Sequence, residues 1–377
     1  MIYLDNSATG GHKISAVIDL VNNVNKYLCA NPGRSGHKLS TKGLDLVYSA
    51  RELFSSAFSC PTEKVIFTKN CTEALNLAIL GAKINKPLVL TTIYEHNSVL
   101  RPLYYLRNTN KIQLKIIEPT PCADIYTQIK NELNENVGMV VTTAVSNVTG
   151  DVLPVNKIGN LLKSHGVFYV VDGAQAGGHI PLSLEKDNIS ALCFAGHKGF
   201  YGLMGTGVLL LNENADVNPL LCGGTGDYTL LETQPDSYPE KLEAGTINLS
   251  GVASLLEGAR YAIDNVIRFG EYLYSLTEKT IDGLNLISGV KCYSNPNPAG
   301  IVSFSVYNLS SMQVAEKLDT EFDIAVRGGL HCAPLAHKHL GTLETGLVRA
   351  SFSPNNQSSE ARALLLAVKK IADSVKG

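Results

Sequence analysis

The feature that most constrains the fold of this chain is an alternation of short apolar runs and amphipathic segments between residues 65 and 211. Polar or glycine-rich residues bound each apolar run, which is typical of a buried strand. Such runs predict strands at residues 65–68, 88–92, 112–117, 137–143, 168–171, 191–194 and 207–211. Strands that alternate with helices form a parallel sheet covered by helices on both faces. The sequence therefore predicts an α/β fold with a mainly parallel seven-stranded sheet.

The pattern changes after about residue 248. A long helical segment at 252–277 is predicted to cross between two domains, and a final amphipathic helix closes the chain. Between these helices lie strand candidates at 301–306, 324–327 and 347–352. We therefore expect a large domain at 13–260 and a smaller α+β domain at 261–377, which residues 1–12 join.

Composition narrows the classes of function. The chain has 377 residues, with 32 Lys and Arg against 34 Asp and Glu and no basic run, so neither nucleic acid nor a membrane surface is an expected partner. No apolar run is long enough to span a bilayer, and the residues after Met1 lack the features of a signal peptide. The 8 cysteines contain no C-x-x-C pair, which is typical of free thiols in a reducing compartment. We expect a cytoplasmic protein.

Two neighbouring strand candidates end in reactive side chains. The first is followed by Asp172 and Gln175, and the second by His197 and Lys198. In open α/β sheets, the carboxyl ends of parallel strands form the functional site. A carboxylate that pairs with a pyridine nitrogen and a lysine that forms an imine are the minimum set for pyridoxal phosphate (PLP). Taken singly, Asp172 would be a turn residue and Lys198 a surface lysine, but their combination favours a PLP site.

Further strand ends carry polar groups toward the same edge. Thr72 follows the strand at 65–68 at the start of a helix, where backbone N–H groups and a hydroxyl can hold a phosphate. His96 follows the next strand and could lie flat on a cofactor, and Asn147 follows the strand at 137–143. Taken one at a time, these are an ordinary helix cap and a structural histidine. Their recurrence at strand ends predicts one shared site.

A glycine-rich loop near the C-terminus carries a candidate nucleophile. Cys332 lies downstream of Arg327, in an accessible, electropositive setting that favours a thiolate. A zinc site formed by Cys332, His337 and His339 is the alternative, but no second cysteine lies at a finger-like spacing. Arg349, in the middle of an apolar strand candidate, needs a carboxylate, either from the protein or from an amino-acid substrate.

Short motifs along nearly the whole chain resemble those of one enzyme family. In order they are Y-L-D-N-S-A-T, N-P-G-R-S-G-H, T-E-A-L-N, E-H-N-S, S-N-V-T-G, V-D-G-A-Q, G-H-K, E-A-G-T-I-N, R-G-G-L-H-C-A and V-R-A-S. The chain resembles the class-V, fold-type I PLP enzymes, in particular the cysteine desulfurase and selenocysteine lyase group. The resemblance implies that fold, PLP as the cofactor, and a homodimer.

The resemblance also implies a role for each matching residue. Lys198 would be the Schiff-base lysine, and His96 would stack on the cofactor. The cofactor ring would also contact Asp172, Gln175 and Asn147. The phosphate would contact Cys71, Thr72, His197 and, from the neighbouring subunit, Thr246. The substrate would contact Asn6, Asn147 and Arg349, and Cys332 would be the nucleophile that forms a persulfide.

Some positions depart from the usual family pattern. Ala195 stands where Ser or Thr is usual, Cys71 where Thr is common, and Leu330 where some relatives have a second histidine. The compact R-G-G-L-H-C-A motif resembles that of the subgroup with a short catalytic loop.

We interpret the chain as a PLP-dependent cysteine desulfurase that converts L-cysteine to L-alanine and leaves a persulfide on Cys332. L-Selenocysteine is an alternative substrate, and a sulfur-accepting protein is an expected partner. The first alternative is a class-V aminotransferase or another PLP lyase, selenocysteine lyase included; in an aminotransferase Cys332 would be dispensable. The second alternative is a scaffold that retains PLP and binds a partner without turning over a substrate.

Overall fold

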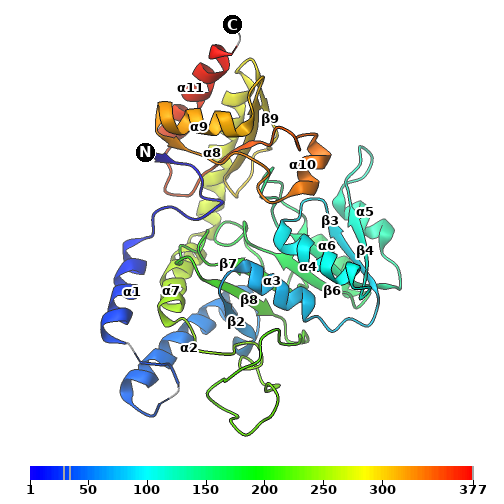
Figure 1. Cartoon of the computed structure of the whole chain (residues 1–377), viewed down its shortest axis with the longest axis vertical. Coiled ribbons are helices and arrows are strands. Elements are labelled where there is room, and N and C mark those ends of the chain that lie inside the picture. Colours follow the sequence, from blue (N-terminus) through cyan, green and yellow to red (C-terminus); the bar gives the residue numbers. More distant parts are fainter. Residues whose placement is uncertain (29, 34, 376–377) are drawn as a thin grey trace.

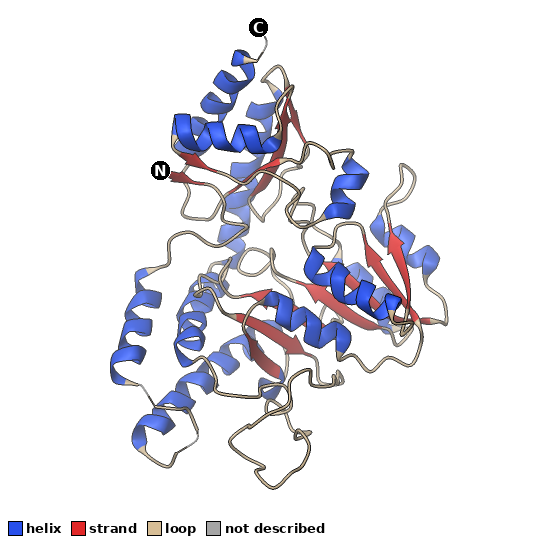
Figure 2. Cartoon of the chain, viewed as in Figure 1, coloured by secondary structure: helices blue, strands red, loops and turns tan. Residues whose placement is uncertain are grey.

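The computed structural model describes residues 1–28, 30–33 and 35–375. Cys29, and Arg34 of the N-P-G-R-S-G-H motif, lie outside the described residues. The ribbon forms a larger body around a long sheet and a smaller body that contains the N-terminus and the C-terminal helix (Figures 1 and 2).

The predicted seven-stranded sheet is confirmed. Its strands are β2 (Val65–Thr68), β3 (Leu88–Thr92), β4 (Gln113–Ile117), β5 (Val137–Thr143), β6 (Phe168–Asp172), β7 (Ala191–Ala195) and β8 (Gly207–Leu211). Their order across the sheet is β2-β8-β7-β6-β5-β3-β4. Strand β8 runs antiparallel to β2 and β7, whereas the other neighbours are parallel. The carboxyl ends of the parallel strands therefore meet at one edge.

The central strands are apolar because helices cover them on both sides. Every residue of β5, β7 and β8 is buried. The register pairs Thr143 of β5 with Asp172 of β6, and Asp172 with Cys193 of β7. β5 and β6 therefore end level, β7 extends two residues further, and Asp172 lies in the middle of the sheet edge.

The helices of the larger body form two layers. They are α1 (Ser15–Tyr27), α2 (Lys38–Phe58), the 3₁₀ turn η1 (Thr62–Lys64), α3 (Cys71–Leu80), α4 (Asn97–Asn108), α5 (Ile125–Glu132), α6 (Val155–Lys163) and α7 (Leu249–Asp264). Leu75 of α3 and Leu103 of α4 belong to the apolar cluster on one face of the sheet. Phe54 of α2, Leu162 of α6 and Ala259 of α7 belong to the cluster on the other face. Both faces of the sheet are thus buried, as the alternating pattern predicts.

The smaller body has its own sheets and core. Its elements are β1 (Ile2–Tyr3), α8 (Val266–Asn285), β9 (Val290–Cys292), β10 (Ile301–Val306), α9 (Ser311–Phe322), β11 (Ile324–Ala325), α10 (Pro334–Leu340), β12 (Val348–Ser351) and α11 (Ser358–Ser374). An antiparallel sheet has the order β12-β10-β9, and β1 pairs in parallel with β11. Leu4 is fully buried in the same core. The start of the chain therefore packs on the smaller body.

The predicted continuous helix at 252–277 is wrong. Helix α7 ends at Asp264 and α8 begins at Val266. Asn265 between them leaves helical geometry, and its Nδ2 donates to the carbonyl of Tyr261 at 2.8 Å. A short polar side chain that bonds the backbone in this way favours a helix end. We propose the domain boundary at 260/261, just before this break. Among the described residues, no helix is both long and apolar enough to cross a membrane.

Candidate active site

Asp172 and Lys198 lie at the ends of adjacent strands, as the sequence predicts. Asp172 is the last residue of β6 and is 4% exposed, and Lys198 follows β7. Desolvation lowers the pKa of Lys198, opposed by the charge of Asp172 and reinforced by Arg349 and Arg327. A lowered pKa increases the share of neutral amine at neutral pH, which is the form that attacks a carbonyl carbon.

The two oxygens of Asp172 have different surroundings. Oδ1 accepts from the backbone N–H of Ala174 at 2.9 Å and lies 3.5 Å from Sγ of Cys71. Among the described residues, none donates to Oδ2. A buried carboxylate with one oxygen held by the protein and the other free fits a pyridine N–H. The thiol of Cys71 therefore contacts the same carboxylate that would pair with the pyridine nitrogen of PLP.

The start of α3 provides free hydrogen-bond donors. Asn70 caps the helix by accepting from the N–H of Glu73 at 2.9 Å. Within the described part of the chain, the N–H groups of Cys71 and Thr72 have no acceptor. Free N–H groups at a helix N-terminus attract a phosphate. This arrangement fits the predicted phosphate position, with the backbone of Cys71 rather than its side chain as the donor.

His96 is held in a defined orientation by a serine that the sequence interpretation did not single out. It is the N-cap of α4, and its Nδ1 accepts from the N–H of Ser98 at 3.0 Å. The hydroxyl of Ser98 lies 2.8 Å from both Nδ1 of His96 and Oγ1 of Thr72. Burial lowers the pKa of His96 and keeps the ring neutral, a state suited to stacking on a cofactor. A serine two positions after a histidine at a helix start was the available signal.

Glu95, next to His96, is a second residue that sequence analysis missed. Its Oε1 accepts from Oγ1 of Thr92 at 2.6 Å and from the N–H of Thr143 at 3.0 Å, which ties the end of β3 to the end of β5. Burial raises the pKa of Glu95 to about 8, so the carboxyl is largely protonated at neutral pH. No local sequence pattern indicates this burial, because the contact with Thr143 comes from a strand 48 residues further along the chain.

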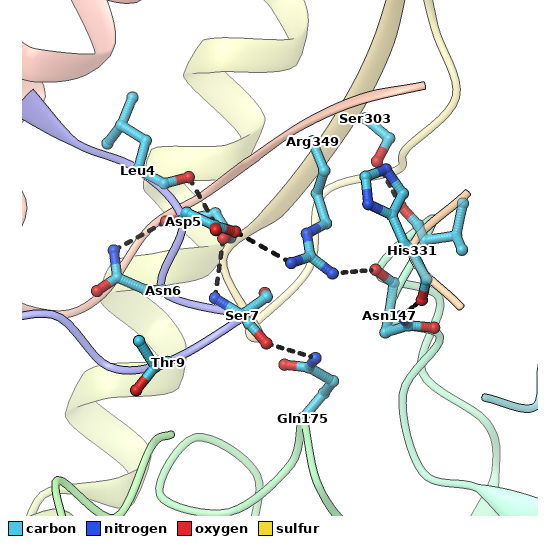
Figure 3. A network of polar contacts seen from close by, with 12 residues as sticks. Leu4, Asp5, Asn6, Ser7, Thr9, Asn147, Gln175, Ser303, His331 and Arg349 are labelled. Atoms are coloured by element: carbon cyan, nitrogen blue, oxygen red, sulfur yellow. Dashed lines mark hydrogen bonds and ion pairs between the residues drawn. The ribbon is translucent and has the colours of Figure 1, made fainter. Parts of the chain in front are cut away.

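The N-terminal segment passes between the two bodies. Its residues form hydrogen bonds that involve several of the predicted site residues (Figure 3). Nε2 of Gln175 donates to the carbonyl of Ser7 at 3.1 Å. Nδ2 of Asn6 donates to the carbonyl of Ser351 at 2.9 Å. Nδ1 of His197 lies 3.0 Å from the hydroxyl of Thr9. In this structure Gln175, Asn6 and His197 therefore use these groups to hold the N-terminal segment against the site.

Arg349 is almost completely buried, and its carboxylate partner is Asp5 (Figure 3). Arg349 is 1% exposed, its Nη2 lies 3.1 Å from Oδ1 of Asp5, and its Nη1 donates to the carbonyl of Asn147 at 3.0 Å. Nε of Arg349 has no partner among the described residues. The sequence predicted a carboxylate for Arg349 but not which one, because Asp5 lies 344 residues away in the chain.

Cys332 is an exposed residue of a strained turn that is tied to the larger body. His331 and Cys332 both have positive φ, 49° and 58°, in the left-handed region that non-glycine residues avoid. Nδ2 of Asn147 donates to the carbonyl of His331 at 2.7 Å, and the N–H of Asn97 donates to the carbonyl of Cys332 at 2.8 Å. The side chain of Cys332 remains exposed. The contacts from Asn147 and Asn97 hold the strained turn beside His96.

Thr246, which the resemblance assigns to the neighbouring subunit's phosphate, lies apart from the described site residues of this chain, and the histidines of the alternative zinc site have other partners. Thr246 is exposed, lines a cavity of about 610 Å³ beside α2, and forms no hydrogen bond with a described site residue. The three zinc candidates do not cluster, since His337 pairs with Thr342 at 2.8 Å and His339 with Glu118 at 2.6 Å. The described residues contain no group of three potential metal ligands.

Together these residues fit PLP. A lysine with a lowered pKa, a carboxylate with one free oxygen, a neutral histidine and free N–H groups at a helix start converge on one sheet edge. Asn147 adds a buried Oδ1 without a partner among the described residues. A fold and a site of this kind define an α/β enzyme that can hold a phosphorylated aldehyde cofactor.

The chain belongs to the class-V aminotransferase family, which it matches over residues 2–364. This family uses PLP. The chain is 32% identical to a probable cysteine desulfurase of Methanothermobacter thermautotrophicus, over 98% of this chain and 94% of that protein. It is also 32% identical to one of Pyrococcus abyssi, over 100% of this chain and 95% of the relative. The apo structure of the cysteine desulfurase from Thermococcus onnurineus NA1 superposes with a TM-score of 0.91 at 30% identity, covering 99% of this chain and 95% of that one.

Proposed function

We propose that this chain is a PLP-dependent cysteine desulfurase, which converts L-cysteine to L-alanine and retains the sulfur as a persulfide on Cys332. When bound at Lys198, PLP would supply an electron sink that weakens the bonds at the substrate α-carbon. The cofactor would be held by the amine of Lys198, Oδ2 of Asp172, the ring of His96 and the N–H groups of Cys71 and Thr72. Gln175, Asn147 and His197 line the same edge.

Substrate binding and proton transfer are carried out by residues of the chain. Arg349 would bind the substrate carboxylate, with Asn147 and Asn6 beside it. Its Nε has no partner among the described residues, and its Nη2 would exchange Asp5 for the substrate, so that two N–H groups pair with the carboxylate. Lys198 would take up and return a proton at Nζ, since its lowered pKa makes the neutral amine accessible.

Cys332 would supply the nucleophile. Its thiolate attacks the substrate sulfur, a sulfur–sulfur bond forms, and the carbon–sulfur bond of the substrate breaks. The electron pair of the broken bond stays with the amino-acid part, which leaves as alanine after protonation.

The observation that carries the proposal is the position of Cys332. Its turn adopts a strained backbone, and residues from the larger body, Asn147 and Asn97, hold the carbonyls of His331 and Cys332. Transamination at the lysine and the cofactor requires no thiol nucleophile. An aminotransferase would therefore not need an exposed cysteine held in this way. The names of the relatives at about 30% identity support the same function.

The test is the variant Cys332→Ser in the PLP-loaded protein. A serine hydroxyl is too weakly ionised at neutral pH to replace a thiolate. We expect release of sulfide and alanine from L-cysteine to collapse, while the visible absorption of bound PLP is unchanged. In the wild type, mass spectrometry should find a persulfide on Cys332. Cys122, an exposed cysteine elsewhere on the chain, provides the control variant Cys122→Ser, which should keep full activity. Full desulfurase activity in Cys332→Ser would refute the nucleophile assignment and favour an aminotransferase.

Further parts of the proposal concern assembly, partners and location. The exposed Thr246 and the cavity of about 610 Å³ that it lines support a homodimer in which Thr246 reaches the phosphate of the neighbouring subunit. L-Selenocysteine would be an alternative substrate, and the persulfide would pass to a sulfur-accepting protein in the cytoplasm. Light scattering that found a monomer with tightly bound PLP would contradict the dimer.

A further inference from the structure

Two buried thiols flank the carboxylate of Asp172. Cys71 is the first residue of α3, and Cys193 pairs with Asp172 across β6 and β7. Sγ of Cys71 lies 3.5 Å from Oδ1 of Asp172, within the range of a hydrogen bond to sulfur. The described residues show no hydrogen bond between the thiol of Cys193 and Asp172. The two cysteines therefore share a neighbour but differ in their contact with it.

The thiol of Cys71 is a hydrogen-bond donor rather than a nucleophile. Burial raises the pKa of Cys71 well above its usual value, and the charge of Asp172 raises it further. At neutral pH the thiol therefore stays protonated and its S–H points at a carboxylate. A thiol is a weak donor, but an ionised acceptor strengthens the bond.

The contact fixes the orientation of the carboxylate. Oδ1 of Asp172 accepts from the N–H of Ala174, two residues along the chain, and from the thiol of Cys71, which belongs to α3. These donors come from different elements, so they restrict rotation of the carboxyl group about χ2. Because both donors use Oδ1, Oδ2 is left free.

We propose that Cys71 is a positioning residue for Asp172: its S–H holds Oδ1, so that Oδ2 faces the pyridine nitrogen of the cofactor. The inference rests on the proposed function, because it takes PLP to be the group that Asp172 meets. The family resemblance assigns Cys71 to the phosphate. In the structure its backbone N–H is free for the phosphate, and its side chain has this separate task.

The experiment compares three variants loaded with PLP: Cys71→Ala, Cys71→Ser and Cys193→Ala. Two quantities are measured for each, the Kd of PLP by equilibrium dialysis and the ¹⁵N chemical shift of PLP labelled at the ring nitrogen. Losing one hydrogen bond of this kind weakens binding about two- to tenfold. We expect that loss in Cys71→Ala, together with a ring-nitrogen shift toward the neutral pyridine value.

The other variants separate the hydrogen bond from its surroundings. Cys71→Ser keeps a donor and should resemble the wild type in both quantities. Cys193→Ala removes a buried thiol beside the same carboxylate but no hydrogen bond, so it should also resemble the wild type. If Cys71→Ala does not fold, Cys71→Val fills the space without a donor, and the same loss is expected.

Two results would overturn the inference. One is a wild-type Kd and a wild-type ring-nitrogen shift in Cys71→Ala or Cys71→Val. The other is an equal change of both quantities in Cys193→Ala. That result would mean that losing any buried thiol near Asp172 is enough to cause the change. Failure of the PLP assignment on which the inference rests is seen separately, in the wild type alone, as the absence of PLP bound to Lys198; failure of the desulfurase assignment is seen in Cys332→Ser and leaves the inference about Cys71 standing.

Discussion

Replacing Asp5 by asparagine removes the countercharge of the buried Arg349. In the wild type, Oδ1 of Asp5 lies 3.1 Å from Nη2 of Arg349, and Arg349 is only 1% exposed. Asp5→Asn preserves the size of the side chain and one acceptor oxygen, but it leaves the guanidinium charge without an opposite charge. The only other described hydrogen bond of that guanidinium goes to the carbonyl of Asn147.

The size of the effect follows from the burial of the two partners. Removing one partner of a fully buried ion pair costs about 3–5 kcal/mol, because the other charge is left unpaired. The side chain of Asp5 is 23% exposed, so water already screens part of the attraction. The asparagine oxygen also retains a weaker hydrogen bond. We therefore expect Asp5→Asn to lower the free energy of unfolding by about 2 kcal/mol.

Urea denaturation of the apoprotein at neutral pH, followed by circular dichroism, measures this loss. The matched control is Glu321→Gln, which removes the exposed i,i+4 pair between Lys317 and Glu321, whose side chains are 38% and 50% exposed. Such helix-surface pairs contribute about 0.3–0.5 kcal/mol. A loss in Asp5→Asn no larger than in Glu321→Gln would refute the argument that burial makes the Asp5–Arg349 pair important.

Three other substitutions test the site. Lys198→Ala should abolish the borohydride-reducible bond between PLP and the protein; mass spectrometry of a reduced variant that still carries PLP would contradict the assignment. Arg349→Lys keeps a positive charge opposite Asp5 but loses the two-pronged guanidinium, so KM for L-cysteine should rise about tenfold or more with PLP affinity unchanged; an unchanged KM would point to Arg327. Glu95 stays protonated in the folded chain up to about pH 8, because burial raises its pKa, but in the unfolded chain it ionises near the usual glutamate pKa of 4.5, so the wild type loses stability as pH rises between these values. Glu95→Gln cannot ionise and should flatten that slope by about 1 kcal/mol per pH unit, and equal slopes of urea midpoint against pH in both proteins would be the contrary result.

The sequence alone was sufficient to predict the sheet and the placement of Asp172 and Lys198 at adjacent strand ends. Buried parallel strands need apolar residues on both faces, so their runs are visible without an alignment. Asp172 and Lys198 were found because reactive groups directly follow such runs, and the carboxyl ends of parallel strands meet at one edge. The prediction of one long helix at 252–277 was wrong. The apolar periodicity continues through Asn265, but the helical backbone is interrupted there.

Only the tertiary structure decided how the site groups are paired. Asp5 and Arg349 are 344 residues apart, and Cys71 and Asp172 are 101 apart, so no local spacing relates them. The carbonyl partners of the Cys332 turn, Asn147 and Asn97, come from the other body. Local patterns encode which residues are buried in a strand or helix. They do not encode which buried polar group meets which, because that depends on how the two bodies pack against each other and against the N-terminal segment.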